Sequence, residues 1–193
     1  MNAPYRPGDG ILFMKVGVHA RESLEDIIER KDKEIRDAGY ALWGYGGSTC
    51  HPSTMVQPFG EAIGARGGVI ELCMEEINSK HFADPVSAAE YSIDGTEWHK
   101  IPEAISVRGS RYALWIDDLR KAEFQLPLNQ TQVPIGNSMG RNGGRYIKGR
   151  VDKACLEMLD RPEIPNDVPL RNIPISLVAT LRKPYAVFLR GQR

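Results

Sequence analysis

The sequence predicts an α+β fold, with a mixed, mostly antiparallel sheet that could be barrel-like and about three helices in a single domain. Apolar residues make up 41% of the 193 residues, which is enough for one core of this size. The predicted helices and strands do not alternate regularly, which argues against a doubly wound parallel sheet. Hairpin signals dominate the second half of the chain, which favours antiparallel pairing.

The first part of the chain predicts a strand, a helix and a second strand. Residues 11–16 form the short apolar run that is expected of a buried strand. Residues 23–37 place apolar side chains on one helical face, with Ser23 as the expected N-cap and Gly39 as the expected C-cap. Residues 40–45 are mostly aromatic and apolar, and they predict the second strand.

The middle of the chain predicts a short helix, a strand and a hairpin. Residues 55–65 carry the apolar pattern of a short helix. Residues 69–77 alternate in the manner of a strand. The pair Asp94-Gly95 separates residues 90–93 from residues 97–101, and this dipeptide is a strong signal for a hairpin turn.

The remaining elements are predicted as strands, apart from one helix and one extended segment. The apolar spacing that begins at Tyr146 predicts a helix that reaches about Leu159. Four prolines predict that residues 160–174 form an extended segment that wraps the domain. Further strands are expected at residues 105–108, 112–116, 123–126, 175–181 and 185–189.

The stretch that points most directly to a ligand is residues 134–150, which holds five glycines and four basic residues. No Asp or Glu lies between Glu123 and Asp152, so the stretch is locally cationic. Glycines let a ligand approach backbone amides, and the N-terminus of the helix expected here carries free N–H groups that suit an anion. The ligand-binding residues predicted in this stretch are Gly140, Arg141, Gly143, Gly144, Arg145 and Lys148.

An alternative interpretation is that these glycines serve only the turn and that the basic side chains face water. The stretch lacks the Gly-Lys-Ser/Thr of a Walker A loop and the G-x-G-x-x-G spacing of a dinucleotide-binding turn. The stretch therefore predicts an anionic ligand without matching a known phosphate-binding motif.

A second group of functional residue types lies in the loop that follows Trp43. Trp43 and Tyr45 flank a glycine, so both side chains should project from the same face of the predicted strand. Aromatic faces can stack on nucleobases, although both residues could instead belong to the core. The ligand-binding residues predicted in this loop are Trp43, Tyr45, Gly46, Gly47, Ser48 and Thr49.

Together, the two loops predict a binding protein for a small, phosphate-bearing anion. A nucleotide or a signalling nucleotide is the expected ligand, because Arg matches phosphate geometry and the aromatics could hold a base. The protein would then be a receptor or a sequestering protein. Exposed hairpin edges would also allow a homodimer.

Two other functions stay open. The sequence His51-Pro52-Ser53 has the H-x-S form of metal-independent phosphodiesterases, in which His51 would act as general acid or base, assisted by Ser53 or His19. Those enzymes need two such motifs, and Arg21 stands where the motif beginning at His19 needs a hydroxyl. The chain could also be a protein-interaction domain without a ligand.

Composition limits the remaining classes. The 25 basic and 25 acidic residues balance, which argues against general nucleic-acid binding. Neither a C-x-x-C pair nor an H-E-x-x-H motif is present, so we expect no metal and no cofactor. The absence of a signal-peptide pattern and of a long apolar run predicts a cytoplasmic protein that does not enter a membrane.

Overall fold

A single mixed sheet dominates the computed structural model, which describes residues 4–47, 49–81, 84–147, 152–160 and 170–191. Within these residues the sheet has ten strands and follows the order β2-β6-β10-β3-β1-β9-β8. Strands β4 and β7 also pair with β10, and β5 pairs with β4. The strands are β1 Gly10–His19, β2 Ala41–Tyr45, β3 Ile70–His81, β4 Ala88–Ser92, β5 His99–Lys100, β6 Tyr112–Ile116, β7 Arg120–Pro127, β8 Thr131–Gln132, β9 Lys153–Met158 and β10 Asn172–Gly191.

The predicted α+β fold is confirmed, and the described residues form one compact domain. Strands β1 and β3 are parallel, whereas the other strand pairs of the described residues are antiparallel. The barrel-like alternative is wrong, because β2 and β8 end the path of strands and do not pair with each other in the described part of the chain. Edge strands can pair with another chain, so the homodimer stays a prediction.

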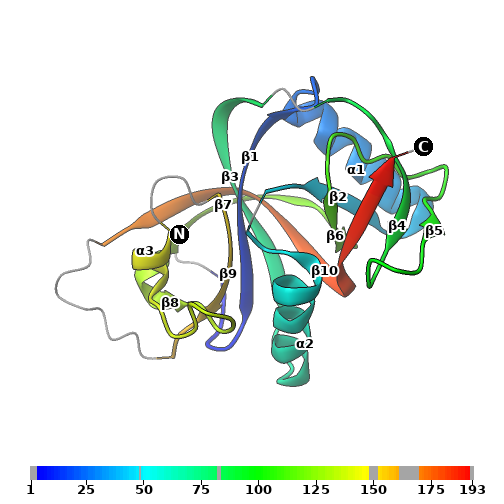
Figure 1. Cartoon of the computed structure of the whole chain (residues 1–193). Coiled ribbons are helices and arrows are strands. Elements are labelled where there is room, and N and C mark those ends of the chain that lie inside the picture. The colour runs from blue at the N-terminus through cyan, green and yellow to red at the C-terminus, as the bar shows by residue number, and fades with distance from the viewer. Residues whose placement is uncertain (1–3, 48, 82–83, 148–151, 161–169, 192–193) are drawn as a thin grey trace.

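Strand β10 joins the two halves of the sheet, one with β3 and β7 and the other with β6 and β4. Figure 1 shows β10 as the long orange-to-red band. Its first part, up to Thr180, pairs with β3 and β7, and Leu181 is the first residue that pairs with β6. From Ala186 onward it pairs with β6 and β4. The two strands expected at 175–181 and 185–189 are therefore parts of one strand that changes neighbours. One core cluster contains both Leu72 of β3 and Leu114 of β6, so the two halves of the sheet share a core.

Three α-helices pack around this sheet: α1 Leu24–Ala38, α2 Gln57–Ala65 and α3 Gly143–Tyr146. The predicted caps of α1 are confirmed: Ser23 Oγ accepts a hydrogen bond from Asp26 N at 3.1 Å, and Gly39 has a φ of 82°. A π-helical turn, Pro52–Val56, precedes α2, and a 3-10 turn covers Leu128–Gln130. None of the helices in the described residues has the length and apolar content that a membrane-spanning segment requires.

The helix predicted from Tyr146 to about Leu159 is wrong. The helix α3 ends at Tyr146, and residues 153–158 form strand β9. All six residues of β9 are buried, because the strand is covered on both faces. Leu156 packs in one core cluster, and Cys155, on the other face, packs in another. A strand that is buried on both faces is continuously apolar, and periodicity cannot then distinguish it from a buried helix.

Two further expectations about the chain have different outcomes. Residues 105–108 do not form a strand, because α1 side chains bind the Ser106 backbone instead and only Arg108 makes an isolated bridge, to Ser87. The hairpin at Asp94-Gly95 is confirmed: Gly95 has a φ of 84°, and β4 and β5 pair on either side. Most of the predicted wrapping segment, residues 161–169, lies outside the described residues.

Candidate functional site

A cavity of about 380 Å³ lies between β1, α1 and β2. Its walls include every residue of β1 from Met14 to His19 and every residue from Trp43 to Gly47. Side chains of a strand alternate between two faces, so a wall made of consecutive residues is a strand edge rather than a face. Helix α1 lines the cavity with Leu24, Ile27, Arg30 and Lys31.

The open edges of β1 and β2 create this cavity. Strand β9 pairs with β1 only from Gly10 to Met14, and one more bond joins Lys15 N to Asp152 O at 2.9 Å. Beyond that point β1 keeps β3 as its only neighbour among the described strands, and β2 pairs only with β6. Figure 1 shows α1 beside the upper part of β1, on the same side as β2. A strand edge exposes backbone donors and acceptors, which a ligand can use.

The cavity has a basic lining. Five basic side chains contribute to its walls: Lys15, Arg30, Lys31, Arg108 and Lys153. Two acidic side chains of the described residues, Glu22 and Asp152, lie among them. Ion pairs of Glu22 with Arg30 and Arg108, and of Glu34 with Arg30 and Lys31, reduce this excess of positive charge. Because apolar walls lower the local dielectric, such an excess of positive charge acts more strongly than it would on an open surface.

Lys153 is the basic residue best placed to meet a ligand. Its side chain is 6% exposed, and its Nζ donates to Asp152 Oδ2 at 3.0 Å. Asp152 is 56% exposed, so water weakens this ion pair, and an ammonium group has three protons to donate. The position of a Cβ on Gly47 would be 3.6 Å from Lys153 Nζ, which places this cation against the glycine loop.

Arg30 and Lys31 serve mainly to hold the wall of the cavity. Both donate to Ser106 O, at 2.6 Å and 2.7 Å, while Glu34 Oε1 accepts from Ser106 N at 3.0 Å. Lys31 also donates to Glu34 Oε2 at 2.8 Å. These bonds fasten α1 to the segment that carries Arg108, so both the backbone groups of Ser106 are satisfied without a strand partner.

Burial lowers the pKa of Lys31 to about 8, although the neighbouring Glu34 carboxylate opposes the shift. In the unfolded chain its pKa returns to about 10.4. Between these values the unfolded chain binds a proton that the folded protein lacks, so the free energy of unfolding should rise with pH, by up to about 1.4 kcal/mol per pH unit.

Lys31→Met lacks this titrating group. We therefore expect the free energy of unfolding of wild type to rise relative to that of Lys31→Met by roughly 1–2 kcal/mol between about pH 8 and about pH 9.5. Urea unfolding of both proteins across this range measures the difference, and the subtraction removes the contributions of other titrating groups. A difference that does not change with pH would show that Lys31 titrates at the same pH in both states.

Five residues predicted to form the site do line the cavity: Trp43, Tyr45, Gly46, Gly47 and His19. Trp43 and Tyr45 are also core residues, with exposures of 4% and 2%. The Tyr45 hydroxyl donates to Cys50 O at 2.7 Å, so this polar group is already used within the protein. His19 Nε2 lies 3.1 Å from Arg108 O, which fixes the imidazole at one end of the cavity.

His51 and Ser53 lie elsewhere. The His51 ring packs edge-on against Tyr112 and Phe188, with centroid distances of 5.4 Å and 5.3 Å, and Ser53 Oγ is 3.4 Å from His51 Nδ1. Neither residue lines the cavity that contains His19. The structure therefore does not bring His19 and His51 to one site, and it gives no support to a phosphodiesterase that uses these two histidines.

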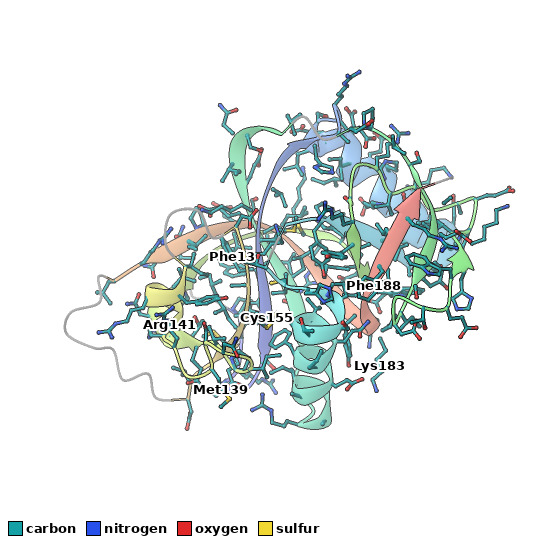
Figure 2. All side chains as sticks on the ribbon, in the orientation of Figure 1. Phe13, Met139, Arg141, Cys155, Lys183 and Phe188 are labelled. Carbon is teal, nitrogen blue, oxygen red and sulfur yellow. The ribbon has the colours of Figure 1, made fainter. Side chains whose placement is uncertain are left out.

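The glycine-rich stretch lies at the other end of the molecule, where Figure 2 shows Arg141 beside α3 and far from α1. Arg141 and Arg145 are exposed, and neither lines the cavity. The amides of four predicted ligand-binding residues donate within the protein: Gly140 N to Val133 O, Arg141 N to Ser138 O, Gly144 N to Asn142 Oδ1 and Arg145 N to Asn142 O. The expected helix N-terminus also reduces to a single turn. The structure therefore does not bring these cations together with Trp43.

Two of the predicted site residues, Ser48 and Lys148, lie outside the described residues. Thr49 is described but does not line the cavity. The basic residues that do line it were missed, apart from His19. A basic residue inside an otherwise buried strand is a usable signal, and Lys15 interrupts such an apolar run. Lys153 gives no such signal, because it follows Asp152 and begins its strand.

A second cavity of about 720 Å³ lies at the N-terminal segment, between residues 4–9, 66–71 and Arg120. Two of its three basic residues are already engaged: Arg120 binds Glu71 and Asp118, and Arg66 lies 2.7 Å from Glu157. No group of three or more His, Cys, Asp or Glu side chains is arranged to hold a metal ion in the described part of the chain. Comparison with protein-family models, with curated proteins and with solved structures finds no match to this chain.

Proposed function

We propose that the protein binds a small, phosphate-bearing anion in the cavity between β1, α1 and β2. The observation that carries this proposal is the excess of basic side chains around a cavity that also has an aromatic and aliphatic wall. A volume of about 380 Å³ lies within the range of small-molecule sites and is in keeping with a mononucleotide-sized ligand.

In this proposal the anionic group binds Lys153 and the adjoining glycine loop. The loop contributes Gly46 and Gly47, and nothing lies within 4 Å of a Cβ position on Gly46. A ligand can therefore approach this backbone closely. The uncharged part of the ligand, such as a nucleobase, packs against Trp43, Val16 and Ile27, which line the cavity and belong to one core cluster.

The first test is a thermal-shift screen with inorganic phosphate and with mono-, di- and cyclic nucleotides. A ligand at 100 times its Kd stabilises by about 2.7 kcal/mol, which corresponds to a rise in Tm of roughly 5–10 °C for a chain of this size. If none of these compounds raises the Tm, the proposal is rejected.

We expect Lys153→Met to weaken the binding of such a ligand at least tenfold, because a charge-assisted hydrogen bond contributes about 1.5–3 kcal/mol. The matched control is Arg141→Met, which removes one exposed cation from the glycine-rich stretch. Calorimetric titration of both variants measures the two affinities. Loss of binding in Arg141→Met with normal binding in Lys153→Met would instead place the site in the glycine-rich stretch.

A further inference from the structure

Two cysteines from distant parts of the sequence meet in the interior of the protein. Cys50 Sγ lies 4.0 Å from Cys155 Sγ, and the two side chains are 4% and 3% exposed. Both thiols are free, and Figure 2 shows Cys155 in the middle of the molecule beside β1. Because a disulfide has an S–S distance of about 2.05 Å, bond formation needs an approach of about 2 Å, which side-chain rotation and a small loop movement can supply.

Cys50 lies in a loop that is held in a conformation unusual for its residue type. Its φ is 57°, a left-handed value that residues other than glycine adopt rarely. The hydrogen bond from the Tyr45 hydroxyl to Cys50 O, 2.7 Å long and buried, holds this part of the loop. The loop therefore presents the Cys50 side chain to β9 in a defined orientation.

We propose that Cys50 and Cys155 are an oxidation site at which a disulfide fastens the glycine loop of the cavity to β9. The loop residues Gly46 and Gly47 line the cavity, and so does Lys153, two residues before Cys155. The bond would thus link two walls of the cavity at adjacent points. Its formation does not depend on the proposed ligand.

The oxidant in this proposal is hydrogen peroxide. One thiol attacks the peroxide, the O–O bond breaks, and a sulfenic acid and one water molecule form. The second thiol then attacks the sulfenic sulfur, so that the S–S bond forms, the S–O bond breaks and a second water molecule leaves. Two electrons pass from the two sulfurs to the peroxide, and both thiol protons end in water.

The environment of the pair sets the conditions for this reaction. The hydrogen bond with Cys50 and burial raise the pKa of the Cys155 thiol well above its ordinary value. Since the thiolate is the reactive form, we expect cross-linking to be slow at neutral pH and to accelerate as the pH rises.

The test is treatment of the full chain with hydrogen peroxide at about pH 9, where a larger fraction of the thiols is ionised than at neutral pH. Tryptic mapping should then recover one linked species that joins peptide 37–66 to peptide 154–171 and has lost two hydrogens. The oxidised protein should also show a higher Tm, by roughly 5–10 °C, and slower amide exchange in residues 46–50, both reversed by a reducing agent.

The third cysteine provides the matched control. Cys73 is buried on the other face of the sheet, where its Sγ lies 2.9 Å from the Tyr5 hydroxyl. Cys73→Ser should leave the cross-link unchanged, whereas Cys50→Ser and Cys155→Ser should abolish it. The proposal is overturned if peroxide-treated wild type keeps Cys50 and Cys155 unlinked, cross-links through Cys73, or forms sulfinic acid without a disulfide. These three outcomes are measured on wild type, so they do not depend on the folding of any variant.

Discussion

Replacement of Glu34 by glutamine is expected to lower the free energy of unfolding by about 3–5 kcal/mol, because it leaves the buried Lys31 ammonium without its counter-charge. Glu34 is 2% exposed and accepts from Lys31 Nζ, Arg30 Nη1 and Ser106 N, at 2.8 Å, 3.3 Å and 3.0 Å. A glutamine of the same size presents N–H groups to at least one of these donors. Urea unfolding at pH 7 measures the loss.

The same helix contains a control for this variant. Lys33 and Asp37 form an ion pair whose side chains are 69% and 44% exposed, so Asp37→Asn should change stability by less than about 0.5 kcal/mol. The loss in Glu34→Gln should shrink at about pH 9, where Lys31 can release its proton. If the loss at pH 7 is below about 1 kcal/mol, the hydrogen bonds between α1 and Ser106 do not hold the cavity wall as described.

Replacement of Gly143 by alanine is expected to destabilise the protein by about 1–3 kcal/mol, since overpacking forces neighbouring atoms apart. A Cβ at this position would overlap Thr131 Oγ1 and would lie 2.8 Å from Leu128 O. Thr131 is fully buried and its hydroxyl donates to that carbonyl at 2.7 Å, so neither group can move without loss of a buried hydrogen bond. Thermal or urea unfolding measures the effect.

Gly46→Ala is the matched control for Gly143→Ala. Gly46 has nothing within 4 Å of its Cβ position, so Gly46→Ala should leave the stability within about 0.5 kcal/mol of wild type. The effects on affinity for the phosphate ligand should be reversed. Gly46→Ala should weaken binding, whereas Gly143→Ala, measured at a temperature at which it is folded, should bind as wild type does. Weakened binding in folded Gly143→Ala alone would restore a ligand role for the glycine-rich stretch.

These expectations separate the two reasons for which glycine occurs in this chain. Gly143 is required by packing against Thr131, and Gly44 likewise leaves no room for a Cβ beside Ser110 and Val107, the latter at 2.9 Å. Gly46 instead borders open space in the cavity, and Gly47 adopts a φ of 98° beside Lys153. Sequence composition counts all of them equally, which explains why the larger cluster near residue 140 gave the more prominent signal.

Local chemistry determined the parts of the fold that were predicted correctly. Helix α1 has its own caps at Ser23 and Gly39 and an amphipathic pattern, and the turn at Asp94-Gly95 fixes its hairpin. In both cases the signal and the structure lie within a few residues of each other. Strand β9 was mistaken for a helix because burial on both faces, which comes from distant neighbours, removed the alternation.

The α+β class, the capped helix α1 and the loop with Gly46 and Gly47 follow from the amino-acid sequence alone, because caps, turns and periodicity are short-range properties. The place where a ligand could bind depends instead on contacts between distant segments. The cavity exists because β9 leaves β1 after Met14 and because β2 pairs on one side alone, and both facts depend on strands far apart in the chain. Lys15, Lys153 and Arg108 line the same cavity as Trp43 through this non-local pairing.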